Sequence, residues 1–163
     1  MHKRKKQICD SWRMDETYIK VGGKDRYLYR AVDKQGNTVD FLLTKRRIKG
    51  SAQKFLNKAI GNNGKPRLIN IDKSGSNTEA SRIINRHSLT FKKIKTRRVK
   101  YLNNIVEQDH RTIKRRIAIT TGFKEFESAQ RTLAGIEIIN IIRKDQLSNS
   151  KKSWFATFKS LAA

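Results

Sequence analysis

The chain has 163 residues, with 38 Lys and Arg against 14 Asp and Glu, so its net charge is +24. This length fits one domain, and the apolar share of 36% is too high for a disordered tail. Positive charges at this density repel one another, and an anionic partner relieves that repulsion. Nucleic acid is the leading candidate. An acidic membrane surface is second, because no basic amphipathic helix of the interfacial type stands out.

The cysteine and histidine content narrows the class further. The single cysteine, Cys9, cannot form an internal disulfide, which is typical of a reducing, cytoplasmic location. The richest apolar stretch, residues 136–142, is far too short to span a bilayer. His2 and His87 show no zinc-ligand spacing with Cys9, which argues against a structural zinc. The sequence therefore predicts a cytoplasmic protein with no membrane segment.

The first part of the chain has strand periodicity. Residues 1–10 are basic and aperiodic, and we interpret them as a linker or a cut end. Residues 12–21, 27–32 and 38–44 favour strands separated by short turns, which predicts an antiparallel meander. The period then changes to that of a helix, with Ser51 as the N-cap and Gly61 at the C-terminal end.

The second part alternates strands and helices. Residues 68–71 predict a buried strand, and a capping box at 76–79 predicts the start of a helix. A weak fifth strand is expected within 95–101, a long basic helix over 103–119, and a last helix over 125–143. This order predicts one α/β domain over residues 11–146, followed by a tail over 147–163 whose role the sequence does not indicate.

Three of the few acids stand where a carboxylate needs a compensating cation. Asp15 lies inside the first strand, Asp72 follows the apolar strand, and Glu107 lies in the long basic helix. Two Mg²⁺ ions would compensate them, because hard cations take oxygen ligands and a metal pair promotes phosphodiester chemistry. Singly, such acids are more often turn residues or ion-pair partners. The hypothesis therefore depends on the whole set and on the 34 residues that separate Asp72 from Glu107.

The long helix can be divided into faces at about 100° per residue. Val106, Ile113 and Ile117 fall within about 40° of one another and predict a buried stripe. Glu107 and Lys114 fall within about 20° of each other on a neighbouring flank. That flank also carries Asn103, His110 and Arg111. An acid for metal and basic groups for phosphate suit a DNA-cutting helix, although a solvated face with i,i+4 ion pairs explains the same pattern.

Basic residues cluster at 45–47, 92–100 and 114–116. Such clusters often serve solubility, but with this net charge we interpret the set as a surface for phosphate contacts. Lys73 follows Asp72 directly and Lys100 precedes the long helix, so these two are best placed. The candidate DNA-binding residues are Lys73, Lys100, Asn103, His110, Arg111, Lys114, Arg115 and Arg116.

The acids stand inside distinctive local sequences. These are WRMDETYIK at 12–20, YLYRAVD at 27–33, NIDK at 70–73, KYLNNIVEQDHR at 100–111, IKRR at 113–116 and AGIE at 134–137. Together they resemble the DDE transposases of bacterial insertion sequences, most closely the small group that moves by replicative co-integrate formation. The likeness covers roughly residues 10–146, and the last gap has the family's D-34-E form.

The resemblance implies a ribonuclease-H-like fold, with a five-stranded mixed sheet and an extra C-terminal helix. It implies that Asp15, Asp72 and Glu107 are the catalytic triad that binds two Mg²⁺ ions, with Mn²⁺ as a substitute, and that Lys114 holds DNA. In the family's reaction, water cuts at each element end and frees a 3′-hydroxyl, which then attacks target DNA. The implied partner is double-stranded DNA at element ends and targets, bound by a homodimer or larger assembly in the bacterial cytoplasm, associated with the nucleoid.

Both ends of the chain depart from the family pattern. Members usually carry an N-terminal helix-turn-helix segment that reads the inverted repeats, whereas this chain begins at the expected junction into the catalytic domain. The stretch after residue 146, with Trp154, Phe155 and Phe158, has no recognised counterpart. The alternative hypothesis is therefore a non-catalytic DNA-binding remnant of a truncated transposase gene. A basic structural binder of the ribosomal-protein kind is a third hypothesis, which explains the charge but not the three acids.

Overall fold

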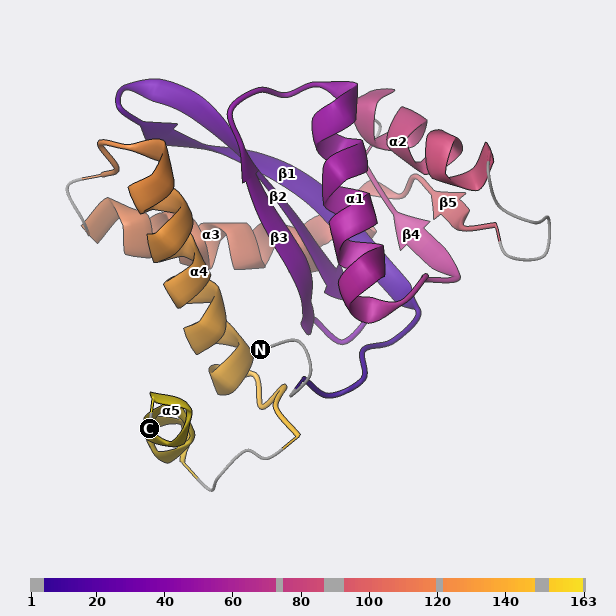
Figure 1. Cartoon of the computed structure of the whole chain (residues 1–163). Helices are drawn as coiled ribbons and strands as arrows, with labels where there is room; N and C mark the ends of the chain where they lie inside the picture. Colours follow the sequence, from indigo (N-terminus) through magenta and orange to yellow (C-terminus); the bar gives the residue numbers. More distant parts are fainter. Residues whose placement is uncertain (1–4, 73–74, 87–92, 120–121, 149–152, 163) are drawn as a thin grey trace.

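The computed structural model describes residues 5–72, 75–86, 93–119, 122–148 and 153–162. A five-stranded sheet with the order β3-β2-β1-β4-β5 forms its centre, with helices on both faces (Figure 1). Strands β1 (Ser11–Val21), β2 (Lys24–Asp33) and β3 (Thr38–Thr44) are antiparallel neighbours. Strands β4 (Leu68–Asn70) and β5 (Lys95–Arg97) run parallel to β1. The predicted α/β architecture with a mixed five-stranded sheet is confirmed.

The first hairpin is tighter than the sequence analysis expected. Gly22 and Gly23 have φ angles of 57° and 72°. Two positive φ angles are the requirement of a two-residue type I′ turn, and glycine adopts them at little steric cost. Strand β2 therefore begins at Lys24 rather than at Tyr27, because the short turn leaves Lys24 free to pair with Val21.

Helices α1 (Lys49–Asn63) and α2 (Gly75–Arg86) cover one face of the sheet. Phe55 of α1 packs with Trp12 of β1 and Tyr29 of β2 in one core cluster. In Figure 1, α1 lies in front of the sheet and α3 behind it. The apolar residues Ala52, Phe55, Leu56 and Ala59 form the buried side of α1, as its helical period predicts.

The predicted helix caps were wrong. The N-cap of α1 is Ile48, and Ser51 lies inside the helix, where its hydroxyl donates to the Arg46 carbonyl at 2.8 Å. The helix runs past Gly61 and ends before Gly64, whose φ of 80° suits a helix terminus. Helix α2 begins at Gly75, one residue before the expected capping box. In both helices, the capping pattern therefore did not locate the first helical residue.

Helices α3 (Asn104–Ile119) and α4 (Phe126–Arg143) cover the opposite face, and a 3-10 turn η3 (Lys100–Asn103) precedes α3. Ile113 of α3 and Leu133 of α4 join Leu28 of β2 in a second core cluster. Val106 and Ile113 are fully buried and Ile117 is partly buried, which confirms the predicted stripe of α3.

A further helix, α5 (Trp154–Ala162), packs against α4 and was not expected, because α4 was predicted to be the last helix. Among the described residues, no helix combines the length and the apolar character that crossing a membrane requires.

Candidate active site

The parallel pairing of β1 with β4 brings two acids together. Arg13 of β1 pairs with Asn70 of β4, and the same offset continued by two residues places Asp15 beside Asp72. One carboxylate oxygen each from Asp15, Glu16 and Asp72 lie within 4.8 Å of one another. Because β4 ends at Asn70, the chain that follows it, rather than another strand pair, lies beside Asp15.

The third acid reaches the same place from α3. Glu107, in the first turn of α3, lines a cavity of ≈ 380 Å³ together with Asp15 and Asp72. The other lining residues are Ile71, Arg98, Lys100 and Asn103. The structure thus brings together the three acids selected from the sequence and places Lys100 beside them. Arg98 is a further cation of this cavity. The sequence analysis had named it only as part of the basic cluster at 92–100.

Two buried asparagines tie together the segments that carry the acids. The Asn70 side-chain N–H group donates to the Asn103 side-chain oxygen at 2.6 Å and to the Val99 carbonyl at 2.9 Å. Asn103 in turn donates to the Met14 carbonyl at 3.4 Å, one residue before Asp15. Asn103 is only 2% exposed, which argues against the direct phosphate contact expected of its side chain. Its visible role is to join β1, β4 and η3.

Burial and neighbouring carboxylates alter the ionisation of Asp15. Burial and the negative charges of Glu16, Asp72 and Glu107 raise the pKa of Asp15 to about 7, and a backbone N–H donated by Glu16 opposes the rise. A bound cation would relieve this repulsion. The donors are all carboxylate oxygens, which fits the preference of Mg²⁺ and Mn²⁺ for hard ligands. The residues present therefore suit a divalent cation.

His110 lies behind Asp15 rather than on the outer flank of α3. Its side chain is buried, and its Nδ1 is 3.6 Å from a carboxylate oxygen of Asp15. Burial and the positive charges of Arg30 and Lys114 lower the pKa of His110 to about 3, so the ring is neutral at physiological pH. A buried neutral ring is poorly suited to hold phosphate, which argues against the DNA contact expected from the helical wheel.

Glu16 is an acid that the sequence analysis did not select. Alternation along β1 places it on the sheet face opposite to Asp15. One of its oxygens accepts from Arg47 Nε at 2.7 Å, and the other accepts from Asn77 Nδ2 at 2.6 Å. Donors from the protein therefore engage both oxygens. The only indication in the sequence was that Glu16 directly follows Asp15. Its two partners, Arg47 and Asn77, are distant from it in the chain.

The other candidate DNA-binding residues differ in exposure. Arg111, Lys114 and Arg115 are exposed on α3, and Arg116 is partly buried. The Lys114 ammonium lies 4.5 Å from the centre of the Tyr18 ring, a cation–π contact that leaves it at the surface. Lys73 lies outside the described residues.

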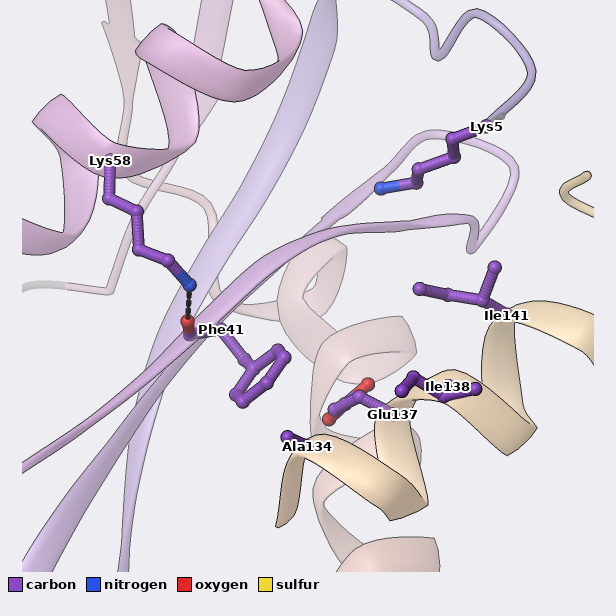
Figure 2. Close-up of a pocket in the computed structure, with 7 residues that line it drawn as sticks. All are labelled: Lys5, Phe41, Lys58, Ala134, Glu137, Ile138 and Ile141. Atoms are coloured by element: carbon purple, nitrogen blue, oxygen red, sulfur yellow. Dashed lines mark hydrogen bonds between the residues drawn. The ribbon is translucent and has the colours of Figure 1, made fainter. Parts of the chain in front are cut away.

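Figure 2 shows a second cavity, of ≈ 210 Å³. It shares no lining residue with the cavity of the three acids. It is lined by Lys5, Phe41, Lys58, Ala134, Glu137, Ile138 and Ile141. Its one acid, Glu137, is paired with the buried Arg30, whose Nε lies 2.9 Å from Glu137 Oε1. With a mostly apolar lining and a committed acid, this cavity lacks the groups for phosphodiester chemistry.

Comparisons with known proteins identify the family of the chain. Residues 9–146 match the family model described as a DDE domain, of the IS240 type. The chain therefore belongs to the DDE domain family of insertion-sequence transposases. It is 41% identical over 143 residues to a transposase for the insertion sequence-like element IS431mec of Staphylococcus aureus (strain Mu50), an alignment that covers 87% of this chain and 62% of the relative. The transposase for IS257 in transposon Tn4003 of Staphylococcus aureus gives the same identity and coverage. The chain thus spans somewhat less than two thirds of the length of these relatives.

Solved structures with the same fold include integrase catalytic core domains. The BIV integrase catalytic core domain superimposes with a TM-score of 0.57 at 15% identity, covering 94% of this chain and 96% of that one. The HTLV-2 integrase catalytic core domain, in a dimeric form with magnesium, gives 0.54 at 22% identity over 66% of this chain and 70% of that one. These likenesses establish the fold, which is the ribonuclease-H-like one expected.

Proposed function

We propose that this chain, over residues 11–146, is the catalytic domain of an insertion-sequence transposase that cuts element ends and joins their 3′-hydroxyls to target DNA. The observation that carries the proposal is the meeting of Asp15, Asp72 and Glu107 in one cavity. Membership of the DDE domain family supports it, since relatives that share the domain are named transposases. A non-catalytic DNA-binding remnant is not favoured, because binding alone gives no reason for three acids to meet in a chain this basic.

In this proposal the three acids are both the catalytic residues and the ligands of two Mg²⁺ ions, with Mn²⁺ as a substitute. The integrase core named above was solved with magnesium, which supports the choice. A metal pair held by these residues would stabilise the charge at the reacting phosphate and activate the attacking oxygen. Three carboxylates would fix the position of the metal pair: Asp15 on β1, Asp72 in the segment after β4, and Glu107 on α3.

Exposed cations around the cavity would hold the DNA backbone. Arg98 and Lys100 line the cavity itself, and Arg111, Lys114 and Arg115 continue the basic surface along α3. Lys73 and Arg116 remain part of the proposed set. Phosphate contacts of this kind position the duplex without reading its sequence. We place the reaction on double-stranded DNA, carried out by a homodimer or larger assembly at the nucleoid in the bacterial cytoplasm.

The proposal is tested by a strand-transfer assay. The full chain is incubated with a pre-cut duplex that carries the element's terminal repeat and a free 3′-hydroxyl, together with a target plasmid. Joined strands are expected with Mg²⁺ or Mn²⁺ and not with EDTA. The absence of joined product at every concentration of both metals would contradict the proposed activity.

Metal binding is expected to strengthen as the pH rises towards 7. With the pKa of Asp15 at about 7, a cation must displace a proton below that pH, so affinity gains up to about tenfold per pH unit and levels off above it. His110 does not contribute, because its pKa of about 3 keeps it neutral throughout. Calorimetry of Mn²⁺ binding in two buffers of different ionisation enthalpy should detect more proton release at pH 6 than at pH 8. A flat profile from pH 6 to pH 8 would contradict this.

Lys114→Ala is expected to weaken binding to any duplex sequence about equally. Removal of one phosphate contact should reduce the slope of log K against log salt by about one. Fluorescence anisotropy with a random-sequence duplex at several salt concentrations measures this slope. Lys54→Ala is the matched control, because Lys54 is an exposed lysine of α1, on the opposite face of the sheet. Equal slope changes in both variants would reject a specific contact at Lys114.

A further inference from the structure

The Asn77 side chain makes two hydrogen bonds to which the proposed function assigns no role. It lies in the first turn of α2 and is completely buried. Its side-chain nitrogen donates to Glu16 Oε2 at 2.6 Å and to Asp72 Oδ1 at 3.1 Å. Donation to two carboxylates fixes the orientation of the amide, since the flipped amide would set its oxygen against two negative oxygens.

Glu16 and Arg47 hold Asn77 in the position from which it contacts Asp72. Glu16 is held by the Arg47 guanidinium, whose Nε and Nη2 both approach the Oε1 atom of Glu16. The four residues form a continuous chain of hydrogen bonds that runs from Arg47 through Glu16 and Asn77 to Asp72. The Glu16 side chain is only 5% exposed, so water competes little for these bonds.

The chemical type of each group matters. A neutral amide orients a carboxylate without cancelling its charge, whereas a lysine or arginine in its place would compete with a cation for Asp72. The Arg47 guanidinium pairs with Glu16 and not with Asp72, so the Glu16 carboxylate is not available as a metal ligand. Negative charge therefore stays on the acids that line the cavity, Asp15, Asp72 and Glu107.

We propose that Asn77 is a positioning residue that orients the Asp72 carboxylate for a divalent cation, and that Glu16 and Arg47 hold Asn77 in place. This inference rests on the proposed function of the cavity. Groups that orient a metal ligand from behind typically change metal affinity about 10–100-fold when they are removed.

The test measures cation binding rather than activity. Mn²⁺ is titrated into the full chain without DNA, and the EPR signal of free Mn²⁺ reports the dissociation constant. Asn77→Leu, which keeps the volume and removes the donor, should raise this constant about 10–100-fold. Asn85→Ala is the matched control. Asn85 lies in the same helix and makes two hydrogen bonds, both to the Ile94 backbone. A Mn²⁺ constant for Asn77→Leu within twofold of the wild type would overturn the inference.

Arg47→Ala gives a second test whose sign discriminates between two effects. Arg47 is half-exposed, so its loss should leave the fold intact even if Asn77→Leu does not fold. Simple electrostatics predicts tighter Mn²⁺ binding, because a positive charge near Asp72 is removed. The proposed positioning role predicts severalfold weaker Mn²⁺ binding, because Glu16 would no longer hold Asn77 in place. Tighter or unchanged binding in Arg47→Ala would overturn the role given to Glu16 and Arg47.

Failure of this inference can be separated from failure of the proposed function. Asp72→Asn should abolish high-affinity Mn²⁺ binding if the cavity is a metal site. If the wild type and Asp72→Asn bind Mn²⁺ equally, the proposed function fails. If only the Asn77 and Arg47 variants match the wild type, the positioning role alone is wrong.

Discussion

Asp72→Asn is expected to lower the rate of strand transfer about 10³-fold or more while leaving DNA binding intact. Asn has nearly the shape of Asp but lacks the negative charge, so the cavity keeps its form and loses a ligand. Loss of several kcal/mol of transition-state stabilisation corresponds to this change in rate. Product formation from the pre-cut duplex is measured on a denaturing gel, and binding is measured by anisotropy in EDTA.

The control for the change in charge is Asp25→Asn. Asp25 is a surface acid of β2 paired with Lys20 at 2.8 Å, at the opposite end of the hairpin from the cavity. Both variants gain one unit of net charge, so both should bind duplex DNA at least as tightly as the wild type. Only Asp72→Asn should lose joining. Activity of Asp72→Asn within tenfold of the wild type would remove Asp72 from the catalytic set.

Arg30→Met is expected to lower the free energy of unfolding by about 3–5 kcal/mol, the usual effect of removing one partner from a buried ion pair. Arg30 is completely buried, and its guanidinium contacts Glu137 at 2.9 Å through two nitrogens and Asp109 at 3.3 Å. Without it, Glu137 faces the mostly apolar cavity of Figure 2 with no guanidinium to balance it. Urea unfolding followed by tryptophan fluorescence measures the loss.

Two further variants define the cause of that loss. Arg67→Met removes an exposed pair with Asp10 and should change stability by less than about 1 kcal/mol. Arg30→Met combined with Glu137→Leu should regain much of the stability, because no buried charge is then left alone, while Asp109 keeps its 2.5 Å contact with Lys144. A double variant as unstable as Arg30→Met would show that packing, not charge, dominates at this position.

Sequence patterns predicted the parts of the site that are locally encoded. Asp15 stands within an alternating strand, Asp72 follows a short apolar run, and Glu107 lies in a long basic helix. Each of these patterns can be recognised from a few neighbouring residues. Short connections also predicted the antiparallel meander of β1, β2 and β3, which the structure confirms. The strand order and the parallel pairing of β4 with β1 come from the structure. The three acids could therefore be selected before the geometry was known.

What the sequence could not predict depends on pairs that are distant in the chain. Nothing near Glu16 indicates that Arg47 and Asn77 will engage its two oxygens. Asn77 lies inside the expected capping box at 76–79, a pattern that assigns it no contact with a distant residue. His110 shared a helical flank with exposed residues, yet the sheet face that carries Asp15 buries it. Side-chain pairings across layers are decided by tertiary packing, which local propensity does not encode.

The parallel pairing of β1 with β4 also bears on how the chain folds. The meander closes short loops between neighbours in sequence, whereas β4 joins β1 only after the chain has passed through α1. Closing the longer loop has the greater entropic cost, so this topology favours early hairpins and late docking of β4. Asp15 and Asp72 are then kept apart until β4 docks, and their repulsion opposes only that later step. A cation that binds the finished cavity would favour the native state over every earlier one.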